Sequence, residues 1–244
     1  MSKNIEITIP VLNEESTLES QVKLLSVFFK EELSDLGNIS LVIADNGSND
    51  KTQEIAERLS HTIPIVKYIR LDKRGVGLAL KASWLKSDAD IVGYMDLDLA
   101  TDIKHLRDAF SILLNGEGDI VTGSRLAPGA QVIGRTKLRD FTSHSFNRLI
   151  KILFKTKFTD GMCGFKFLNR NKLPILMASG VQSDGWFFAT ELLVVGEALH
   201  LNVVDIPVKW TDDPNSKVKV IKLSIEYMKQ MLNLKKRIAG LKSK

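Results

Sequence analysis

Residues 91–98 read Ile-Val-Gly-Tyr-Met-Asp-Leu-Asp, and this stretch decides the fold that we expect. Its first five residues form an apolar run of strand length, and the run stops at two carboxylates, Asp96 and Asp98. A short apolar run bounded by polar residues is typical of a strand that is buried on both faces. The stretch therefore predicts an inner strand of a layered sheet, with acidic side chains where the strand ends.

Strand-like and helix-like segments alternate around this stretch. Strands are expected at residues 5–9, 39–44, 65–71, 91–95 and 119–122, and helices at 14–36, 52–59, 76–86 and 103–114. The first helix is expected to open with a capping box made by Ser16 and Glu19. Such an order predicts an α/β fold with a mostly parallel central sheet and helices on both faces.

The second half of the chain is less regular. We expect helices at 137–154 and 187–199 and a strand at 203–208; in the first helix one face is shared by Phe146, Leu149, Ile150, Leu153 and Phe154. A last helix is expected from about 218 to 241, with one apolar side made by Val218, Ile221, Ile225, Met228, Leu232 and Ile238. We therefore expect one domain at 1–217 and a basic amphipathic helix at 218–244.

Composition narrows the class of protein. Of the 244 residues, 44% are hydrophobic and 26% are charged, which is typical of a globular chain. A single cysteine, Cys163, excludes a disulfide framework. Residues 217–244 hold nine Lys or Arg and one Glu, so this end carries +8 and the rest of the chain −3. Without an apolar run of membrane-spanning length or a signal-peptide core, the expected location is the cytoplasm.

Polar residues and glycines follow each of the first five expected strands, where a parallel sheet binds its ligands. Asp96 and Asp98 are spaced to give hard oxygen ligands to Mg²⁺ or Mn²⁺, and we favour this interpretation over two helix-capping carboxylates. The turn that contains Gly75 and Gly77 is explained equally well by close packing or by phosphate binding. It does not fit a dinucleotide fingerprint, because no glycine-rich turn follows the first strand.

Four further residues are candidates with open alternatives. Asp45 is suited to binding a nucleobase or ribose, or to capping the next helix. Arg125 follows a strand and is suited to binding phosphate, or to an exposed ion pair. Arg139 and Ser143 lie one helical turn apart and are suited to gripping an anion together, or form an ordinary helix surface.

The ordered set of motifs resembles the family-2 glycosyltransferases of the GT-A fold. It comprises Pro10-Val-Leu-Asn-Glu14, Asp45-Asn-Gly-Ser-x-Asp50, Asp96-x-Asp98 and Gly123-Ser-Arg125. Three downstream runs are similar to those of polyprenyl (dolichyl) phosphate hexose synthases, and most of all to the glucosyl branch and its bacterial relatives. They are Asp160-Gly-Met-Cys-Gly-Phe-Lys166, Trp186-Phe-Phe-Ala-Thr-Glu191 and Trp210-Thr-Asp-Asp-Pro-Asn-Ser-Lys217. The resemblance covers about residues 4–220.

This resemblance implies roles for individual residues. The activated donor would be bound by Pro10, Asn13, Glu14, Asp45, Gly75, Asp96 and Lys217. Asp96 and Asp98 would hold the metal, and Arg125, Arg139 and Ser143 would receive the acceptor phosphate. Arg125 and Lys217 would also take part in catalysis, and Ser216 and Lys217 would close over the donor. Asn46, Thr211 and Pro214 depart from the family pattern, which puts donor binding in question.

The expected activity is the inverting, metal-assisted transfer of a hexose to a polyprenyl phosphate. The donor would be UDP-glucose in the first place, with GDP-mannose as the alternative. A second hypothesis is a family-2 enzyme that acts on a hydroxyl group, with Asp160 or Glu191 as base. A third is a non-enzymatic protein that binds membranes or nucleic acid through its basic end. No nucleic-acid-binding module is recognisable, and we expect peripheral attachment to the cytoplasmic face of the membrane.

Overall fold

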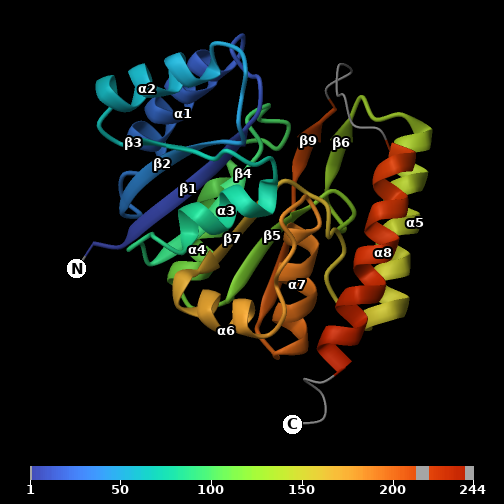
Figure 1. The fold of residues 1–244 in the computed structure, drawn as a ribbon. Helices are drawn as coiled ribbons and strands as arrows, with labels where there is room; N and C mark the ends of the chain where they lie inside the picture. Colours follow the sequence, from blue (N-terminus) through green and yellow to red (C-terminus); the bar gives the residue numbers. More distant parts are fainter. Residues whose placement is uncertain (1, 213–219, 240–244) are drawn as a thin grey trace.

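The computed structural model describes residues 2–212 and 220–239, with side chains from Glu226 onward in the last helix. In these ranges, seven strands form a central sheet (Figure 1). In spatial order they are β3 (Val66–Arg70), β2 (Asn38–Asp45), β1 (Asn4–Val11), β4 (Ile91–Met95), β7 (Phe165–Asn169), β5 (Ile120–Ser124) and β8 (Val203–Pro207). All pairs are parallel except those of β7, so the expected α/β class is confirmed.

Helices cover both faces of the sheet, as the alternating pattern predicts. In chain order they are α1 (Leu18–Glu32), α2 (Thr52–Thr62), α3 (Val76–Trp84), α4 (His105–Leu114), α5 (Lys137–Phe154), α6 (Leu173–Ala178), α7 (Phe188–Ala198) and α8 (Val220–Ala239). A 3₁₀ turn at Arg170–Lys172 precedes α6. One apolar layer includes Ile7, Val22 and Phe110, and the other includes Trp84, Phe188 and Leu193.

Strand β7 runs against its two neighbours, and this insertion was not predicted. Phe167 pairs with Gly93 on β4 and with Val121 on β5. Gly93 lies so close to the ring of Phe167 that a Cβ atom would overlap it. Because β7 enters the sheet from the rim where β4 and β5 end, it carries the preceding loop, residues 160–164, to that rim.

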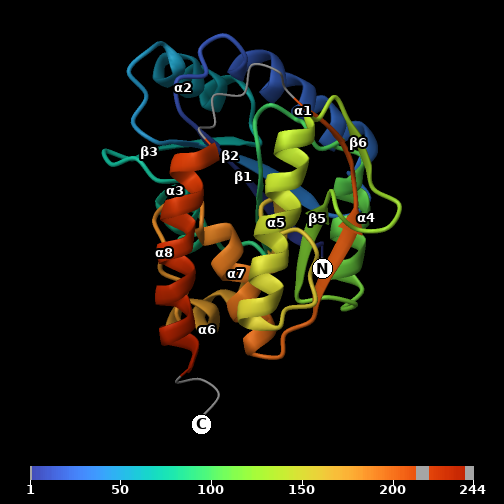
Figure 2. The same ribbon diagram turned by 90° about the vertical axis from the view of Figure 1, so that its right-hand side faces the viewer.

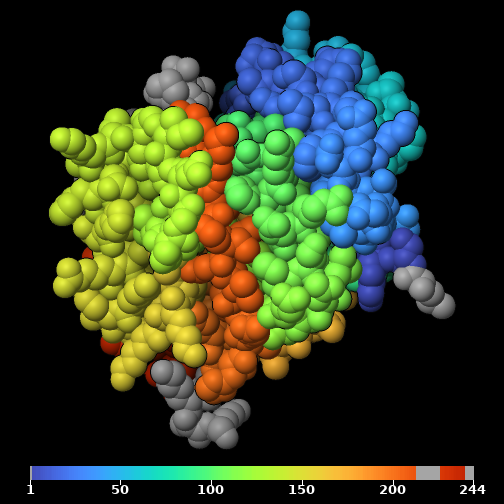
Figure 3. Space-filling view, turned by 180° about the vertical axis from the view of Figure 1, so that it is seen from behind, coloured from blue at the N-terminus to red at the C-terminus, as the bar shows by residue number. Residues whose placement is uncertain are grey.

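A second, two-stranded sheet lies beside the main one. β6 (Gln131–Ile133) and β9 (Lys209–Thr211) are parallel, and Val132 pairs with Trp210. From behind, the segment that contains β9 forms a stripe between the α4 side and the α5 side of the surface (Figure 3). The pairing ties the residues just before α5 to the end of the sheet.

The last helix packs on the domain beside α5 (Figures 1 and 2). The rings of Phe146 and Tyr227 lie 5.3 Å apart between their centroids. In its described part, α8 buries Tyr227, Met231, Leu234 and Ile238. The predicted apolar side is therefore wrong at Met228 and Leu232, which are 44% and 50% exposed. The helix has two apolar stripes, and one of them faces away from the domain.

Some local predictions need correction, whereas the bounds of β4 and α5 match the expected ones. Helix α1 begins at Leu18 rather than at Glu14, and no side chain caps it, so the capping box of Ser16 and Glu19 is absent. The proposed domain limit at 217/218 lies outside the described residues, as do Pro214, Ser216 and Lys217. Of the described helices, none has the length and apolar character needed to cross a bilayer.

Replacing a methionine of α8 by alanine should affect the free energy of unfolding differently on its buried and its exposed stripe. Met231→Ala should lower the free energy of unfolding by roughly 2–4 kcal/mol, since it removes a buried side chain and leaves a cavity. Met228→Ala, three residues earlier on the exposed stripe, is the matched control and should change it by less than about 0.5 kcal/mol. Urea unfolding followed by circular dichroism measures both. Equal effects would contradict the packing of α8 on the domain.

Candidate active site

The rim where β1, β2, β4 and β5 end collects most of the predicted site residues. The loop after β1 is joined to the loop after β2 by several hydrogen bonds. The backbone amide of Asn13 donates to the Ser48 hydroxyl at 3.0 Å, and the Asn13 side-chain oxygen accepts from the Asn49 amide at 2.9 Å. The Glu14 amide donates to Thr52 at 2.8 Å. The loop that carries Pro10, Asn13 and Glu14 therefore has a fixed position against β2.

Asp45 lies under this junction and is fully buried. One carboxylate oxygen accepts from the Ser48 amide and hydroxyl, and the other accepts from Tyr68 and Arg70. Four donors thus satisfy both oxygens within the protein. Asp45 therefore shapes the turn that follows β2, and it does not cap α2, whose N-cap residue is Lys51.

Asp96 and Asp98 lie just after β4, where the chain leaves the sheet. Asp98 is exposed, and one of its oxygens accepts from the Ala100 amide at 3.0 Å. Burial, and next the nearby charge of Asp98, raise the pKa of Asp96 to about 7, although Lys166 and Arg125 act in the opposite direction. Two carboxylates held this close together make each other's ionised form costly unless a cation neutralises them.

Gly164 fixes the position of Asp96. The Asp96 amide donates to the Gly164 carbonyl at 3.1 Å. A Cβ atom at Gly164 would overlap the Asp96 carboxylate, so only glycine leaves room for this side chain. The loop before β7 therefore shapes the acidic site directly, which explains why Gly164 belongs to the Asp160–Lys166 motif.

The carboxylate oxygens of Asp96 and Asp98 are suitable ligands for a hard divalent cation. Among the described residues, no three His, Cys, Asp or Glu side chains gather as a complete metal site. The pair Asp96 and Asp98 supplies two carboxylates, and Mg²⁺ or Mn²⁺ is commonly held by one or two carboxylates with substrate phosphates and water. The residues therefore fit a cation that is shared with a substrate.

The contacts of the turn at Gly75 and Gly77 support close packing rather than phosphate binding. The Gly77 and Leu78 amides at the start of α3 donate to the carbonyls of Gly185 and Asp184, at 3.2 and 3.0 Å. A Cβ atom at either glycine would overlap this loop. The amides that a phosphate would need are already bonded, although the Gly75 amide still joins this turn to the loop after β2 by donating to the Asn46 side chain at 3.2 Å.

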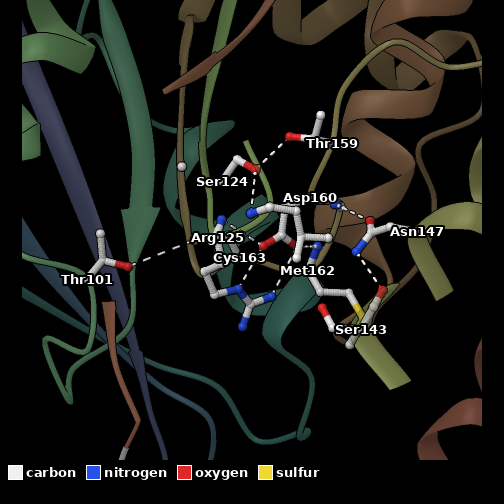
Figure 4. A network of polar contacts seen from close by, with 12 residues as sticks. Thr101, Ser124, Arg125, Ser143, Asn147, Thr159, Asp160, Met162 and Cys163 are labelled. Atoms are coloured by element: carbon white, nitrogen blue, oxygen red, sulfur yellow. Dashed lines mark hydrogen bonds and ion pairs between the residues drawn. The ribbon is translucent and has the colours of Figure 1, made fainter. Parts of the chain in front are cut away.

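Arg125 and Asp160 form a buried ion pair at the end of β5 (Figure 4). Arg125 donates from Nε at 2.7 Å and from Nη2 at 3.0 Å, to the two oxygens of Asp160. The amides of Arg125 and Met162 donate to the same carboxylate. Burial alone would raise the pKa of Asp160, but Arg125 reverses this and holds the pKa well below its usual range.

The other two predicted acceptor residues lie on α5. Arg139 is paired with Asp212 at 2.6 Å. Ser143 is buried, and its hydroxyl has no hydrogen-bond partner within residues 2–212 and 220–239. An unbonded buried hydroxyl costs stability, which a ligand oxygen would recover. Figure 4 shows Ser143 next to Asn147, whose side-chain amide donates to the Ser143 carbonyl at 3.0 Å.

Three further residues of this region were not predicted as site residues. Trp210 lies against the guanidinium of Arg125, 5.3 Å from its ring centroid, and against that of Arg135 at 5.5 Å. Lys166 is fully buried beneath the site, and its ammonium donates to the Cys163 carbonyl at 2.5 Å. Trp210 and Lys166 stand in the recognised motifs, which was a usable signal, whereas no pattern marks Arg135.

The fold and the site define a nucleotide-sugar transferase class, and the comparisons agree. The chain belongs to Glycosyl transferase family 2, whose pattern it matches over residues 6–174. It is 31% identical over 219 residues to Glycosyltransferase AglD of Haloferax volcanii, covering 89% of this chain and 35% of that protein. It thus spans about a third of AglD.

Other relatives are matched over more of their length. The chain is 28% identical to the dolichyl-phosphate beta-glucosyltransferase ALG5C of Trichomonas vaginalis, covering 89% of this chain and 68% of the relative. Glucosyl-3-phosphoglycerate synthase from Mycobacterium tuberculosis, solved with Mn²⁺ and UDP-glucose, has the same fold. Its TM-score is 0.68 at 19% identity, and the match covers 97% of this chain and 79% of that one.

The raised pKa of Asp96 leads to a stability prediction. An acid whose pKa is about 7 in the folded protein is costly to ionise there. Without metal, stability should therefore fall as pH rises from about 4, the unfolded value, towards 7. Asp96→Asn should raise the unfolding free energy at pH 8 by roughly 1–3 kcal/mol, because it removes a buried like charge.

Thermal unfolding in EDTA, with Asp88→Asn as an exposed control, measures this effect. The same Asp96→Asn protein should lose the stabilisation that Mn²⁺ and UDP together give to the unchanged protein. A variant that is less stable than the parent, or that keeps the Mn²⁺-dependent stabilisation, would contradict the assignment of this side chain.

Proposed function

We propose that the protein transfers a hexose, glucose in the first place, from a nucleoside diphosphate sugar to a polyprenyl phosphate. The observation that carries this proposal is that Arg125 lies near enough to Asp96 for their charges to interact, at the rim where Asp98 also follows β4. Anion-binding groups on one side and metal-binding groups on the other suit an acceptor phosphate and a donor diphosphate. The named activity of the dolichyl-phosphate beta-glucosyltransferases supports the same choice.

The donor would lie along the rim between β2 and β4. Pro10, Asn13 and Glu14 would contact the nucleoside, on a loop that is fixed by Ser48 and Thr52. Asp96 and Asp98 would hold Mg²⁺ or Mn²⁺, which supplies positive charge where the departing diphosphate becomes more negative. Lys217, outside the described residues, would add a further positive charge to the diphosphate.

The acceptor phosphate would attack the anomeric carbon from the face opposite the diphosphate. Its oxygen forms the new bond as the bond to the diphosphate breaks, so the configuration inverts. A phosphate monoester has a second pKa of about 6 and is largely dianionic at neutral pH. It needs positioning by Arg125, Arg139 and Ser143 rather than removal of a proton.

The contacts of two carboxylates argue against a hydroxyl acceptor, which would need a general base. Asp160 is locked to Arg125, and its low pKa makes it a weak base. Glu191 is buried, paired with Arg237, and accepts the amides of Gln182 and Ser183. These are the two carboxylates that the sequence offered for this role, and both are used to hold the structure.

Peripheral attachment to a membrane is supported by the surface of α5. Leu138 and Phe141 are each 71% exposed, and they flank Arg139 on the first turns of this helix. Met228 and Leu232 on α8 add the exposed stripe described above. Apolar side chains next to an acceptor site let a lipid chain remain in the bilayer while its phosphate enters the protein.

A transfer assay tests the activity. UDP-glucose labelled in the sugar should give a labelled lipid with undecaprenyl phosphate, and GDP-mannose should give less. The product should be released by mild acid, since a sugar phosphodiester is acid-labile and an ordinary glycoside is not. EDTA should abolish transfer and Mn²⁺ should restore it. An acid-stable product would show a hydroxyl acceptor, and full activity in EDTA would exclude the metal.

The membrane surface has its own test. Replacing Leu138 and Phe141 together by Gln should lower transfer to undecaprenyl phosphate in anionic vesicles by about tenfold or more, because each side chain loses roughly 1.5–3 kcal/mol of burial in lipid. Transfer to a short, water-soluble isoprenyl phosphate should be unchanged. Replacing Leu24 and Val27 on α1, also exposed, is the control. Equal losses with both acceptors would contradict a membrane role.

A further inference from the structure

Arg135, two residues before α5, is buried in an unusual way. Its side chain is only 9% exposed, and Nε and Nη1 are both buried without a hydrogen-bond partner in the described part of the chain. The nearest carboxylate is that of Asp140, with 3.9 Å between Nη1 and Oδ1. A buried guanidinium normally has its donors bonded, because leaving them unbonded costs as much as losing a charged hydrogen bond.

The surroundings of Arg135 increase this cost. Trp210 contacts the guanidiniums of both Arg125 and Arg135, at 5.3 and 5.5 Å from its ring centroid. Burial and the like charge of Arg125 lower the pKa of Arg135, although Asp160, Asp140 and Asp212 act in the opposite direction. The indole stabilises both cations but does not cancel their repulsion. The pairing of Val132 with Trp210 joins the segment that precedes Arg135 to the strand that carries the indole.

Other groups of this region also lack partners that an anion would supply. Asp160 occupies Nε and Nη2 of Arg125, and Nη1 has no hydrogen bond among the described residues. The buried hydroxyl of Ser143 is unbonded as well. Donors of Arg125, Arg135 and Ser143 thus remain unused among the described residues, and Arg135 adds a positive charge beside the Arg125–Asp160 pair that an anionic ligand would neutralise.

We propose that Arg135 is a third cation of the acceptor site, and that its guanidinium binds the acceptor phosphate through Nη1, together with Arg125 and Ser143. This inference rests on the proposed function. It also states a preference: the site takes a doubly charged phosphate monoester over a singly charged phosphodiester. A planar guanidinium presents two parallel donors to phosphate oxygens, which an ammonium group cannot do.

A purely structural role for Arg135, as packing for Trp210, predicts a different result. If the side chain served only to hold Trp210, removing its charge would lower stability and disturb the donor site as well. If it binds phosphate, removing the charge relieves repulsion by Arg125, so Arg135→Gln should be as stable as the parent or more so. Stability and acceptor binding then change in opposite directions.

The experiment compares Arg135→Gln and Arg135→Lys with Arg148→Gln, an exposed arginine on the same helix. The acceptor is a short, water-soluble isoprenyl phosphate, so that membrane binding plays no part. Arg135→Gln should raise KM for this acceptor about 10- to 100-fold, the loss expected for charge-assisted hydrogen bonds. Arg135→Lys should fall between, and Arg148→Gln should match the parent.

Two further measurements accompany the kinetics. The inhibition constant of the methyl diester of the same isoprenyl phosphate should change less than about threefold in Arg135→Gln, since a single charge gains less from the third cation. Binding of UDP in the presence of Mn²⁺, and the midpoint of thermal unfolding, should be retained.

Each outcome decides between the proposals. A parent protein that transfers no sugar to isoprenyl phosphate would overturn both the proposed function and this inference. A parent that transfers sugar, with Arg135→Gln unchanged in KM, would overturn only the role of Arg135. A less stable Arg135→Gln with lost UDP binding would show a structural role and overturn it too. Should that variant fail to fold, an Arg135→Lys protein with parental KM would do the same.

Discussion

The ion pair of Arg125 and Asp160 is the interaction on which the rest of the site depends. Breaking such a pair leaves a buried charge without a partner, a cost of roughly 3–5 kcal/mol. Here the carboxylate is satisfied by four donors, two of them backbone amides. The pair therefore fixes the end of β5 against the loop before β7, and through that loop it fixes Gly164 beside Asp96.

The antiparallel strand β7 makes this connection possible. A purely parallel sheet would send the segment after β5 away to a helix and leave the rim to separate loops. Because β7 lies between β4 and β5, the loop 160–164 crosses directly from the arginine side to the carboxylate side. The arginine side and the carboxylate side of the candidate site are thus joined by one continuous piece of backbone.

Local patterns predicted the elements that local physics controls. The apolar run at 91–95 and the amphipathic run at 137–154 have the expected bounds, because burial on two faces and on one face leaves clear periodicity. Strand β7 was missed, since its partners are distant in sequence and the charged Lys166 interrupts the apolar residues of Phe165–Asn169. The candidate site residues divide in the same way. Asp96, Asp98 and Arg125 directly follow strands that the sequence predicts, whereas Arg135 is recognisable only from the pairing of β6 with the strand that contains Trp210.

The closed start of α3 has a consequence for how the enzyme can handle its donor. In many α/β proteins the first amides of a helix, with the positive end of its dipole, bind phosphate groups. Here Gly185 and Asp184 already accept the amides of Gly77 and Leu78. These amides at the start of α3 are therefore not free for an anion, and a diphosphate bound at this rim would have to be neutralised by other positive charges.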